Sequence, residues 1–233
     1  MKILAIECSA SPVSVAVIED GKIISSAFSN IKVTHSETLM PMVESVLLSA
    51  KSTLGEIGGF AVSNGPGSFT GIRIGISAVK GMAAPENKPC AAVSTLYAMA
   101  SRFTASNGII SPVMDARCGQ VYNALFRAEN GKITRITYDR ALMCEELSAE
   151  LKNYNENITV CGDGSDVFKP FTKGLSSVIF PGAELKFQHA NGVAIAASDM
   201  FKNGETLSPA ELLPVYLRLP QAERELKSKQ KKD

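Results

Sequence analysis

The chain has 233 residues, of which 45% are hydrophobic and 20% charged, and its formal net charge at pH 7 is +1. It is long enough to bury one large core or two of ordinary size, and its balanced charge calls for neither nucleic acid nor a membrane as partner. Five scattered cysteines, none in a Cys-x-x-Cys pair, argue against a disulfide framework and a zinc cluster. With no signal peptide or apolar span expected, the sequence predicts a cytoplasmic protein.

The first 28 residues predict a three-stranded meander, with strands at residues 3–6, 13–18 and 22–28. The first strand ends at Glu7, and a small polar turn follows at residues 8–12. Asp20-Gly21 is a hairpin signal between the second and third strands. The meander therefore carries an acidic side chain at the end of its first strand.

A helix with apolar residues at helical spacing is predicted at residues 36–51, followed by a strand at residues 59–63. The next stretch, residues 65–75, is rich in glycine, but it has neither the spacing nor the lysine of a phosphate-binding loop. Ser68 or Thr70 is expected to cap a helix that continues to about residue 84. Gly71 and Gly75, one turn apart, indicate close approach by another backbone, either in the same lobe or in a partner subunit.

The rest of the chain repeats the order of the first part. A strand at residues 91–93 and a helix from residue 94 to 106 lead to a second meander at residues 112–138. In this meander Asp115 ends the first strand, residues 121–126 form the second, and Asn130-Gly131 is a hairpin before the third strand at residues 132–138. Helices at residues 145–153 and 191–202 and strands at residues 158–161 and 177–180 follow. This order predicts an α/β protein with a duplicated actin-like, ribonuclease-H-like (ASKHA) fold, in which each lobe has a mixed sheet and flanking helices. We expect an N-terminal lobe at residues 1–106, a C-terminal lobe at residues 107–220 and a polar basic tail at residues 221–233.

Catalytic equipment is sparse in this sequence. The turn after the first strand, where actin-like ATPases wrap a phosphate, has no glycine. Glu7 and Asp115 can act as paired carboxylates across a cleft or make ordinary hydrogen bonds there. His35 and His189 are each isolated, so no metal site is predicted. No Gly-x-Ser-x-Gly elbow occurs, and no catalytic residue is assigned.

An ordered set of motifs runs along nearly the whole chain: Ile3-Leu4-Ala5-Ile6-Glu7, His35-Ser36-Glu37-Thr38-Leu39-Met40-Pro41, residues 65–75, Val93-Ser94-Thr95-Leu96, Met114-Asp115-Ala116-Arg117 with Val121-Tyr122, Gly162-Asp163-Gly164 and Pro214-Val215-Tyr216-Leu217-Arg218. In these motifs the chain resembles the TsaB (YeaZ) family, which belongs to the bacterial machinery for threonylcarbamoyladenosine in tRNA. Glu7 stands where the family typically has aspartate, and Cys8 where it often has threonine. Both departures lie in the turn that would hold phosphate in a working ATPase.

The resemblance implies a non-catalytic partner subunit that binds and supports a TsaD-like catalytic subunit through helices of the N-terminal lobe. It implies no tightly bound cofactor, because ATP and metal are used by TsaD-like and TsaE-like partners, and contact with tRNA through the complex. We expect a homodimer when the chain is alone. The expected interface residues are Leu39, Met42, Val43, Val46, Gly71, Gly75, Ala78 and Met82; the expected degenerate nucleotide cleft comprises Glu7, Ser9, Ser11, Asp115, Gly162 and Gly164.

Two alternatives from other classes stay open at this point. The chain can be an independent enzyme, either an actin-like ATPase or kinase or a glycoprotease-like hydrolase. It can also be a free-standing tRNA-binding module, which its balanced charge disfavours.

Overall fold

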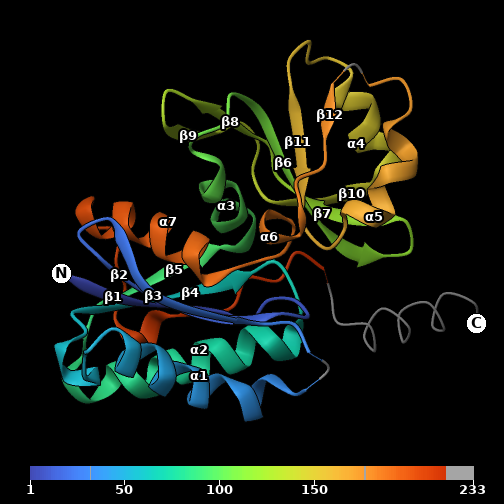
Figure 1. The fold of residues 1–233 in the computed structure, drawn as a ribbon. Coiled ribbons are helices and arrows are strands. Elements are labelled where there is room, and N and C mark those ends of the chain that lie inside the picture. Colours follow the sequence, from blue (N-terminus) through green and yellow to red (C-terminus); the bar gives the residue numbers. More distant parts are fainter. Residues whose placement is uncertain (32, 176, 219–233) are drawn as a thin grey trace, which may run out of the picture.

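The computed structural model describes residues 1–218 except residues 32 and 176, so the basic tail expected at residues 221–233 lies outside the described residues. Two lobes, each with its own sheet, lie one above the other in Figure 1. Within the described residues, one sheet has five strands and is built from residues 2–94, and the other has seven strands from residues 108–179. The predicted duplicated α/β fold is confirmed.

The N-terminal sheet has the strand order β3-β2-β1-β4-β5. Its strands are β1 (Lys2–Glu7), β2 (Val13–Glu19), β3 (Lys22–Ser29), β4 (Gly59–Gly65) and β5 (Cys90–Ser94). The first three strands are antiparallel, and β4 and β5 run parallel to β1. Asp20 and Gly21 both have positive φ, at 50° and 80°, which is the conformation that the hairpin signal predicts.

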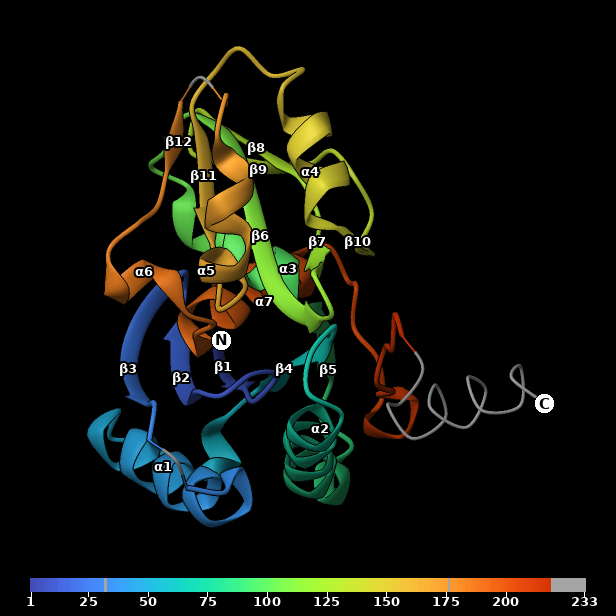
Figure 2. The same cartoon turned by 90° about the vertical axis from the view of Figure 1, so that its right-hand side faces the viewer.

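Helices cover both faces of the N-terminal sheet (Figures 1 and 2). Side chains alternate along β1, so Leu4 and Ile6 pack against α1 (His35–Ser49) and α2 (Phe69–Ala83). Ile3 and Ala5 face the opposite side, toward α7 (Ala190–Lys202). With apolar cores on both faces, β1 is buried apart from its first residue. Glu7, at the end of β1, is therefore carried into the interior.

The second lobe repeats the strand order, as β10-β7-β6-β11-β12, with a β8–β9 hairpin beside β6. Its strands are β6 (Gly108–Arg117), β7 (Gln120–Asn123), β8 (Phe126–Glu129), β9 (Lys132–Arg135), β10 (Arg140–Met143), β11 (Ile158–Cys161) and β12 (Val178–Ile179). The strand predicted at residues 121–126 is split, because its first half pairs with the C-terminal part of β6 and its second half pairs with the start of β6. The hairpin at Asn130-Gly131 is therefore an addition, and β10 occupies the place that corresponds to β3.

The remaining helices of the second half are α4 (Cys144–Leu151), α5 (Ser165–Phe168) and α6 (Ala183–Lys186). Apolar residues of α4 and α5 pack on one face of the second sheet. On its other face lies α3 (Thr95–Ala100), a shorter helix than predicted, which continues into a 3₁₀ turn at Ser101–Phe103. Further 3₁₀ turns occur at Leu54–Glu56, Ala84–Glu86, Lys169–Thr172 and Pro209–Glu211. Among the described residues, no helix is long and apolar enough to cross a membrane.

The last helix, α7, does not belong to the lobe in which the sequence analysis placed it. Its Val193 and Ala197 lie in a core with Ala61 of β4 and Ala91 of β5, so α7 packs on the N-terminal sheet. Further along, Leu207 pairs with Cys90 of β5. The expected C-terminal lobe at residues 107–220 is corrected accordingly: α7 and the segment after it lie on the first lobe, until Leu217 and Arg218 contact the second lobe again.

Candidate functional site

A cleft of about 510 Å³ opens where the two lobes meet. It is lined by Ser9, Ala10, Ser11, His35, Gly67, Ser68, Phe69, Met114, Asp115, Ala116, Arg117, Tyr122 and Asp163. Of the six predicted cleft residues, Ser9, Ser11 and Asp115 line it. Gly162 and Gly164 do not, since they pack closely against Val113 and Met114 of β6, which leaves Asp163 between them to face the cleft.

The sixth predicted residue, Glu7, lies buried behind Ser9. Its Oε1 accepts a hydrogen bond from the Ser9 backbone N–H at 2.6 Å, while its Oε2 has no partner among the described residues. Burial raises the pKa of the Glu7 carboxyl, an effect that the hydrogen bond from Ser9 only partly offsets. Burial also raises the pKa of Asp163, whose Oδ1 accepts a hydrogen bond from Gln188 Nε2 at 2.7 Å.

Asp115 faces the same cleft from the other lobe. Its Oδ2 lies 3.1 Å from Arg117 Nη1, and its Oδ1 accepts a hydrogen bond from the Arg117 backbone N–H at 2.7 Å. The Arg117 side chain is 80% exposed and pairs with Asp115 at the mouth of the cleft. Within the part of the chain that the structure describes, neither Glu7 nor Asp163 forms an ion pair.

The N-terminus of α2 lies beside the cleft and is the place where a helix would bind a phosphate. Here the chain's own atoms already bind two of the N–H groups. The Ser68 N–H donates to the Ser9 carbonyl oxygen at 2.7 Å, and the Ser68 hydroxyl accepts from the Gly71 N–H at 3.3 Å. The turn after β1 and the Ser68 cap thus take up two donors that an anion could otherwise contact.

Among the described residues, no group of three or more His, Cys, Asp or Glu side chains is arranged to hold a metal ion. His35 uses its Nε2 to contact the Ala10 carbonyl oxygen at 2.8 Å, and His189 stacks on Phe28 with ring centroids 5.2 Å apart. Both histidines therefore have structural contacts.

The glycine stretch serves the N-terminal lobe itself. A Cβ atom on Gly71 would overlap the Cys8 carbonyl oxygen, and one on Gly75 would lie 3.1 Å from the Val62 side chain. Gly67, with φ at 156°, abuts the Ser9 carbonyl in the same way. Of the two explanations that the sequence left open for these glycines, the structure selects close approach within one lobe.

Several of the predicted interface residues are likewise part of the N-terminal lobe's own packing. Gly71, Gly75, Val43 and Val46 are buried against their own sheet and have no surface to offer a partner. Leu39 is also buried, although its side chain forms part of the floor of a surface groove. Met42, Ala78 and Met82 are half-buried at the edge of the core, and for them an interface role stays a prediction.

α1 and α2 lie on the far side of the N-terminal sheet from the second lobe (Figure 1), and the surface groove is formed between them. Its volume is about 450 Å³, and it is lined by Ser36, Leu39, Met40, Thr70, Arg73, Ile74, Ser77 and Ala78. Met40 is 42% exposed on its rim. We call it the α1–α2 groove.

Several of these functional candidates were missed from the sequence. Asp163 could have been found, because it stands between two glycines that let the backbone approach β6. Arg73 could have been found as the one charged residue of the glycine stretch. Tyr122 carried no signal of its own, since its place in the cleft depends on the pairing of β7 with β6.

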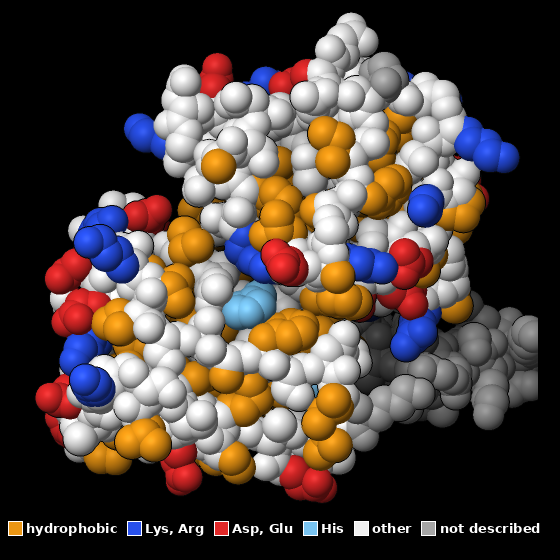
Figure 3. All heavy atoms as spheres, in the orientation of Figure 1, with side chains coloured by type: hydrophobic (Ala, Val, Ile, Leu, Met, Phe, Trp, Pro, Cys, Tyr) orange, Lys and Arg blue, Asp and Glu red, His pale blue; other side chains and the backbone are white. Residues whose placement is uncertain are grey.

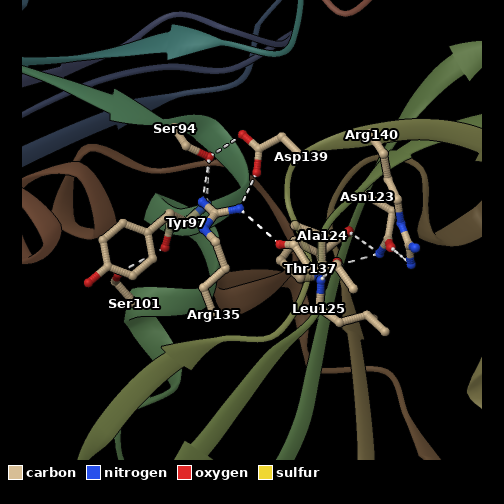
Figure 4. Close-up of polar contacts among 11 residues, drawn as sticks. Ser94, Tyr97, Ser101, Asn123, Ala124, Leu125, Arg135, Thr137, Asp139 and Arg140 are labelled. Atoms are coloured by element: carbon tan, nitrogen blue, oxygen red, sulfur yellow. Dashed lines mark hydrogen bonds and ion pairs between the residues drawn. The ribbon is translucent and has the colours of Figure 1, made fainter.

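A polar network joins the two lobes beside α3 (Figure 4). Arg135 Nη1 lies 2.5 Å from Asp139 Oδ1, and the Ser94 hydroxyl donates to Asp139 Oδ2 at 2.6 Å. The Arg135 guanidinium also lies 4.7 Å from the Phe126 ring centroid and 5.9 Å from that of Tyr97. Ser94 and Tyr97 belong to the β5–α3 junction, whereas Arg135 and Asp139 come from the second lobe, so this network holds one lobe on the other.

We expect Arg135→Met to lower the free energy of unfolding by about 1–3 kcal/mol, because it leaves the half-buried Asp139 without its cation and removes the ring contacts. Arg127→Met is the matched control: its ion pair with Glu156 is more exposed and lies within the second lobe, so its loss costs about 0–1 kcal/mol. Urea denaturation of the two variants measures the difference. Equal effects would contradict the role of Arg135 at the lobe junction.

Comparison with known proteins gives a consistent result. A family model described as "TsaD: tRNA N6-adenosine threonylcarbamoyltransferase" matches residues 22–226. The Bacillus subtilis "tRNA threonylcarbamoyladenosine biosynthesis protein TsaB" is 31% identical over 96% of this chain and 96% of its own length. The Escherichia coli protein of the same name is 31% identical over 99% of this chain and 100% of its own length.

A solved structure described as "YeaZ from Pseudomonas aeruginosa" superimposes with a TM-score of 0.80 at 27% identity. The superposition covers 93% of this chain and 99% of that one. Sequence and structure therefore match the same kind of protein over almost the whole length.

Proposed function

The chain belongs to the TsaB (YeaZ) family, and we propose that it is the non-catalytic partner subunit of the complex that transfers threonylcarbamoyl to the tRNA adenosine next to the anticodon. Its role lies in the biosynthesis of threonylcarbamoyladenosine in tRNA. The observation that carries the proposal is the contrast between the inter-lobe cleft, where the chain's own groups pair with Arg117 and with N–H groups at the start of α2, and the largely apolar α1–α2 groove.

The cleft supports a non-catalytic role in two ways. The Ser68 and Gly71 N–H groups at the start of α2 bind the Ser9 carbonyl oxygen and the Ser68 hydroxyl, and Arg117, at the mouth of the cleft, is paired with Asp115. We propose that ATP and metal are held by partner subunits, a TsaD-like transferase and a TsaE-like ATPase, and that this chain has no tightly bound cofactor of its own.

The α1–α2 groove supports a partner-binding role because most of its exposed lining is apolar, and because α1 and α2 cover the face of the N-terminal sheet opposite the second lobe. We propose that it receives the TsaD-like subunit, and that a second copy of the chain covers it when the partner is absent. Contact with tRNA is made through the complex. In support, lysine and arginine side chains on the face in Figure 3 are interspersed with acidic ones.

Reconstitution of threonylcarbamoyl transfer with and without this chain tests the proposed function. We expect product with the complete set of subunits, none when this chain is omitted, and none from this chain alone. ATP turnover by the isolated chain, or full transfer in its absence, would contradict the proposal.

Met40→Glu tests the groove. Met40 is exposed on the groove rim, so a charge there leaves the core intact but is buried when a partner docks. We expect binding to the TsaD-like subunit, measured by titration calorimetry, to weaken by roughly thirtyfold or more, with a parallel loss of transfer. Ile136→Glu, which places the same charge at a residue of equal exposure in the second lobe, is the control and should bind normally. Normal binding by Met40→Glu would exclude the groove.

A further inference from the structure

One charged side chain, Arg73, is held in a fixed position at the α1–α2 groove. It is exposed on α2, and its Nε donates a hydrogen bond to the Tyr216 hydroxyl at 2.7 Å. Its guanidinium carbon lies 5.5 Å from the centroid of the Tyr216 ring, which itself stacks on Phe69 with centroids 4.3 Å apart. A long, flexible side chain is thus restricted by a hydrogen bond and an aromatic face.

Tyr216 is positioned by the segment that carries it, residues 212–218, which we call the C-terminal strap. The Val215 N–H donates to the Asn64 carbonyl oxygen at 2.7 Å, and Asn64 Nδ2 donates to the Leu213 carbonyl oxygen at 3.3 Å. The strap can lie this close to β4 because Gly65 has no side chain, and a Cβ atom there would overlap the Val215 carbonyl. The strap therefore presents the Tyr216 hydroxyl to α2 from a fixed backbone.

No acidic side chain among residues 1–31, 33–175 and 177–218 neutralises the charge of Arg73. Arg73 forms no ion pair with any described residue, and its Nη atoms make no hydrogen bond among those residues. The residues that line the groove include no Asp or Glu. Because Nε is occupied by Tyr216, the two Nη atoms form the free end of the fork, which suits a carboxylate approaching end-on.

We propose that Arg73, held by Tyr216, is the specificity-determining cation of the α1–α2 groove and binds a carboxylate on the TsaD-like partner. This inference rests on the proposed function, since it concerns the same surface. A second copy of the chain, docked groove to groove, would leave Arg73 without an acidic partner, because none of the residues that line its groove is Asp or Glu. An acidic side chain beside an apolar helix face on a different protein matches both the charge and the groove.

The test is titration calorimetry of the full-length chain against the purified TsaD-like subunit over a series of salt concentrations. Arg73→Met should weaken binding by roughly tenfold or more and flatten its dependence on salt, because the remaining contacts are apolar. Lys152→Met, which removes one exposed positive charge in the second lobe, should change neither quantity. The melting temperature of each variant checks that the fold is intact.

Tyr216 is a positioning residue in this proposal, and Tyr216→Phe keeps its ring while removing the hydroxyl. It should weaken binding by several-fold, but it should have no further effect in a chain that already carries Arg73→Met, since the hydroxyl acts through Arg73. A merely structural role for Tyr216 would give additive effects and would overturn the positioning role.

The outcomes separate this inference from the proposed function. If Met40→Glu abolishes binding while Arg73→Met keeps wild-type affinity and salt dependence, the inference is wrong and the groove assignment stands. If neither substitution affects binding, both fail. Sedimentation of the chain alone measures self-association. If Arg73→Met abolished self-association but left binding to the partner normal, the carboxylate would belong to a second copy, and the proposal would be overturned.

Discussion

Gly71→Ala is expected to destabilise the chain by about 2–3 kcal/mol, although it adds a single methyl group to an α-helix. The added Cβ atom would overlap the Cys8 carbonyl oxygen, which belongs to the turn after β1. Neither side can move freely, because that turn is buried and hydrogen-bonded to the start of α2. In thermal unfolding the melting temperature should fall by roughly 4–12 °C for a chain of this size.

Gly81→Ala is the matched control, since Gly81 lies in the same helix and a Cβ atom there would have no neighbour within 4 Å. This substitution should stabilise the chain by about 0.5–1 kcal/mol, because alanine favours a helix more than glycine does. If both variants moved in the same direction, the close approach of α2 to the β1–β2 turn would not be the reason for Gly71.

Glu7→Gln is expected to stabilise the chain at pH 7 by about 1–3 kcal/mol, because glutamine cannot ionise and so avoids the cost of a buried carboxylate. Glu7 is fully buried, its Oε2 has no partner among the described residues, and burial raises its pKa above the ordinary value of 4.5. Glutamine keeps the oxygen that accepts from the Ser9 N–H and removes the charge. Urea denaturation at pH 7 measures the gain.

The pH dependence of this gain has a definite sign. Because the folded chain holds the Glu7 proton more tightly than the unfolded chain, the stabilising effect of protonation is fully present below pH 4.5 and is lost as pH rises through the raised folded pKa. The difference between Glu7→Gln and wild type should therefore grow across that window and then level off. His189, whose pKa burial lowers to about 4, acts in the opposite direction but is common to both proteins. A difference that does not change with pH would rule out Glu7 as its source.

Strand and helix positions in the first lobe followed closely from local patterns. Alternating or continuous apolar runs and the Asp20-Gly21 turn predicted β1 to β3, and the Ser68 cap predicted the start of α2. These signals are local, since they depend on hydrogen bonds and periodicity within a few residues. The second lobe was less predictable, because β7 and β8 form one apolar run in sequence and are separated by their pairing with different parts of β6.

The candidate site was also predictable where local signals decide it, and unpredictable where tertiary packing does. Ser9, Ser11 and Asp115 were placed in the cleft from their position at strand ends, because the matching ends of the two repeats face each other. Most of the predicted interface residues on α1 and α2 face the core, since helical spacing identifies an apolar face without saying which element covers it. In α1 and α2 that face is covered by the chain's own sheet.

The sequence by itself determined that this chain is a duplicated α/β protein of the TsaB family with little catalytic equipment, because repeats, turn residues and missing motifs are properties of order along the chain. Only the tertiary structure decided what the glycine stretch is for. Its glycines let the β1–β2 turn and the C-terminal strap lie against β4 and α2, contacts between segments up to 150 residues apart. Local sequence patterns do not show where distant segments meet. Only that meeting decides whether a small residue faces a partner or the core of its own chain.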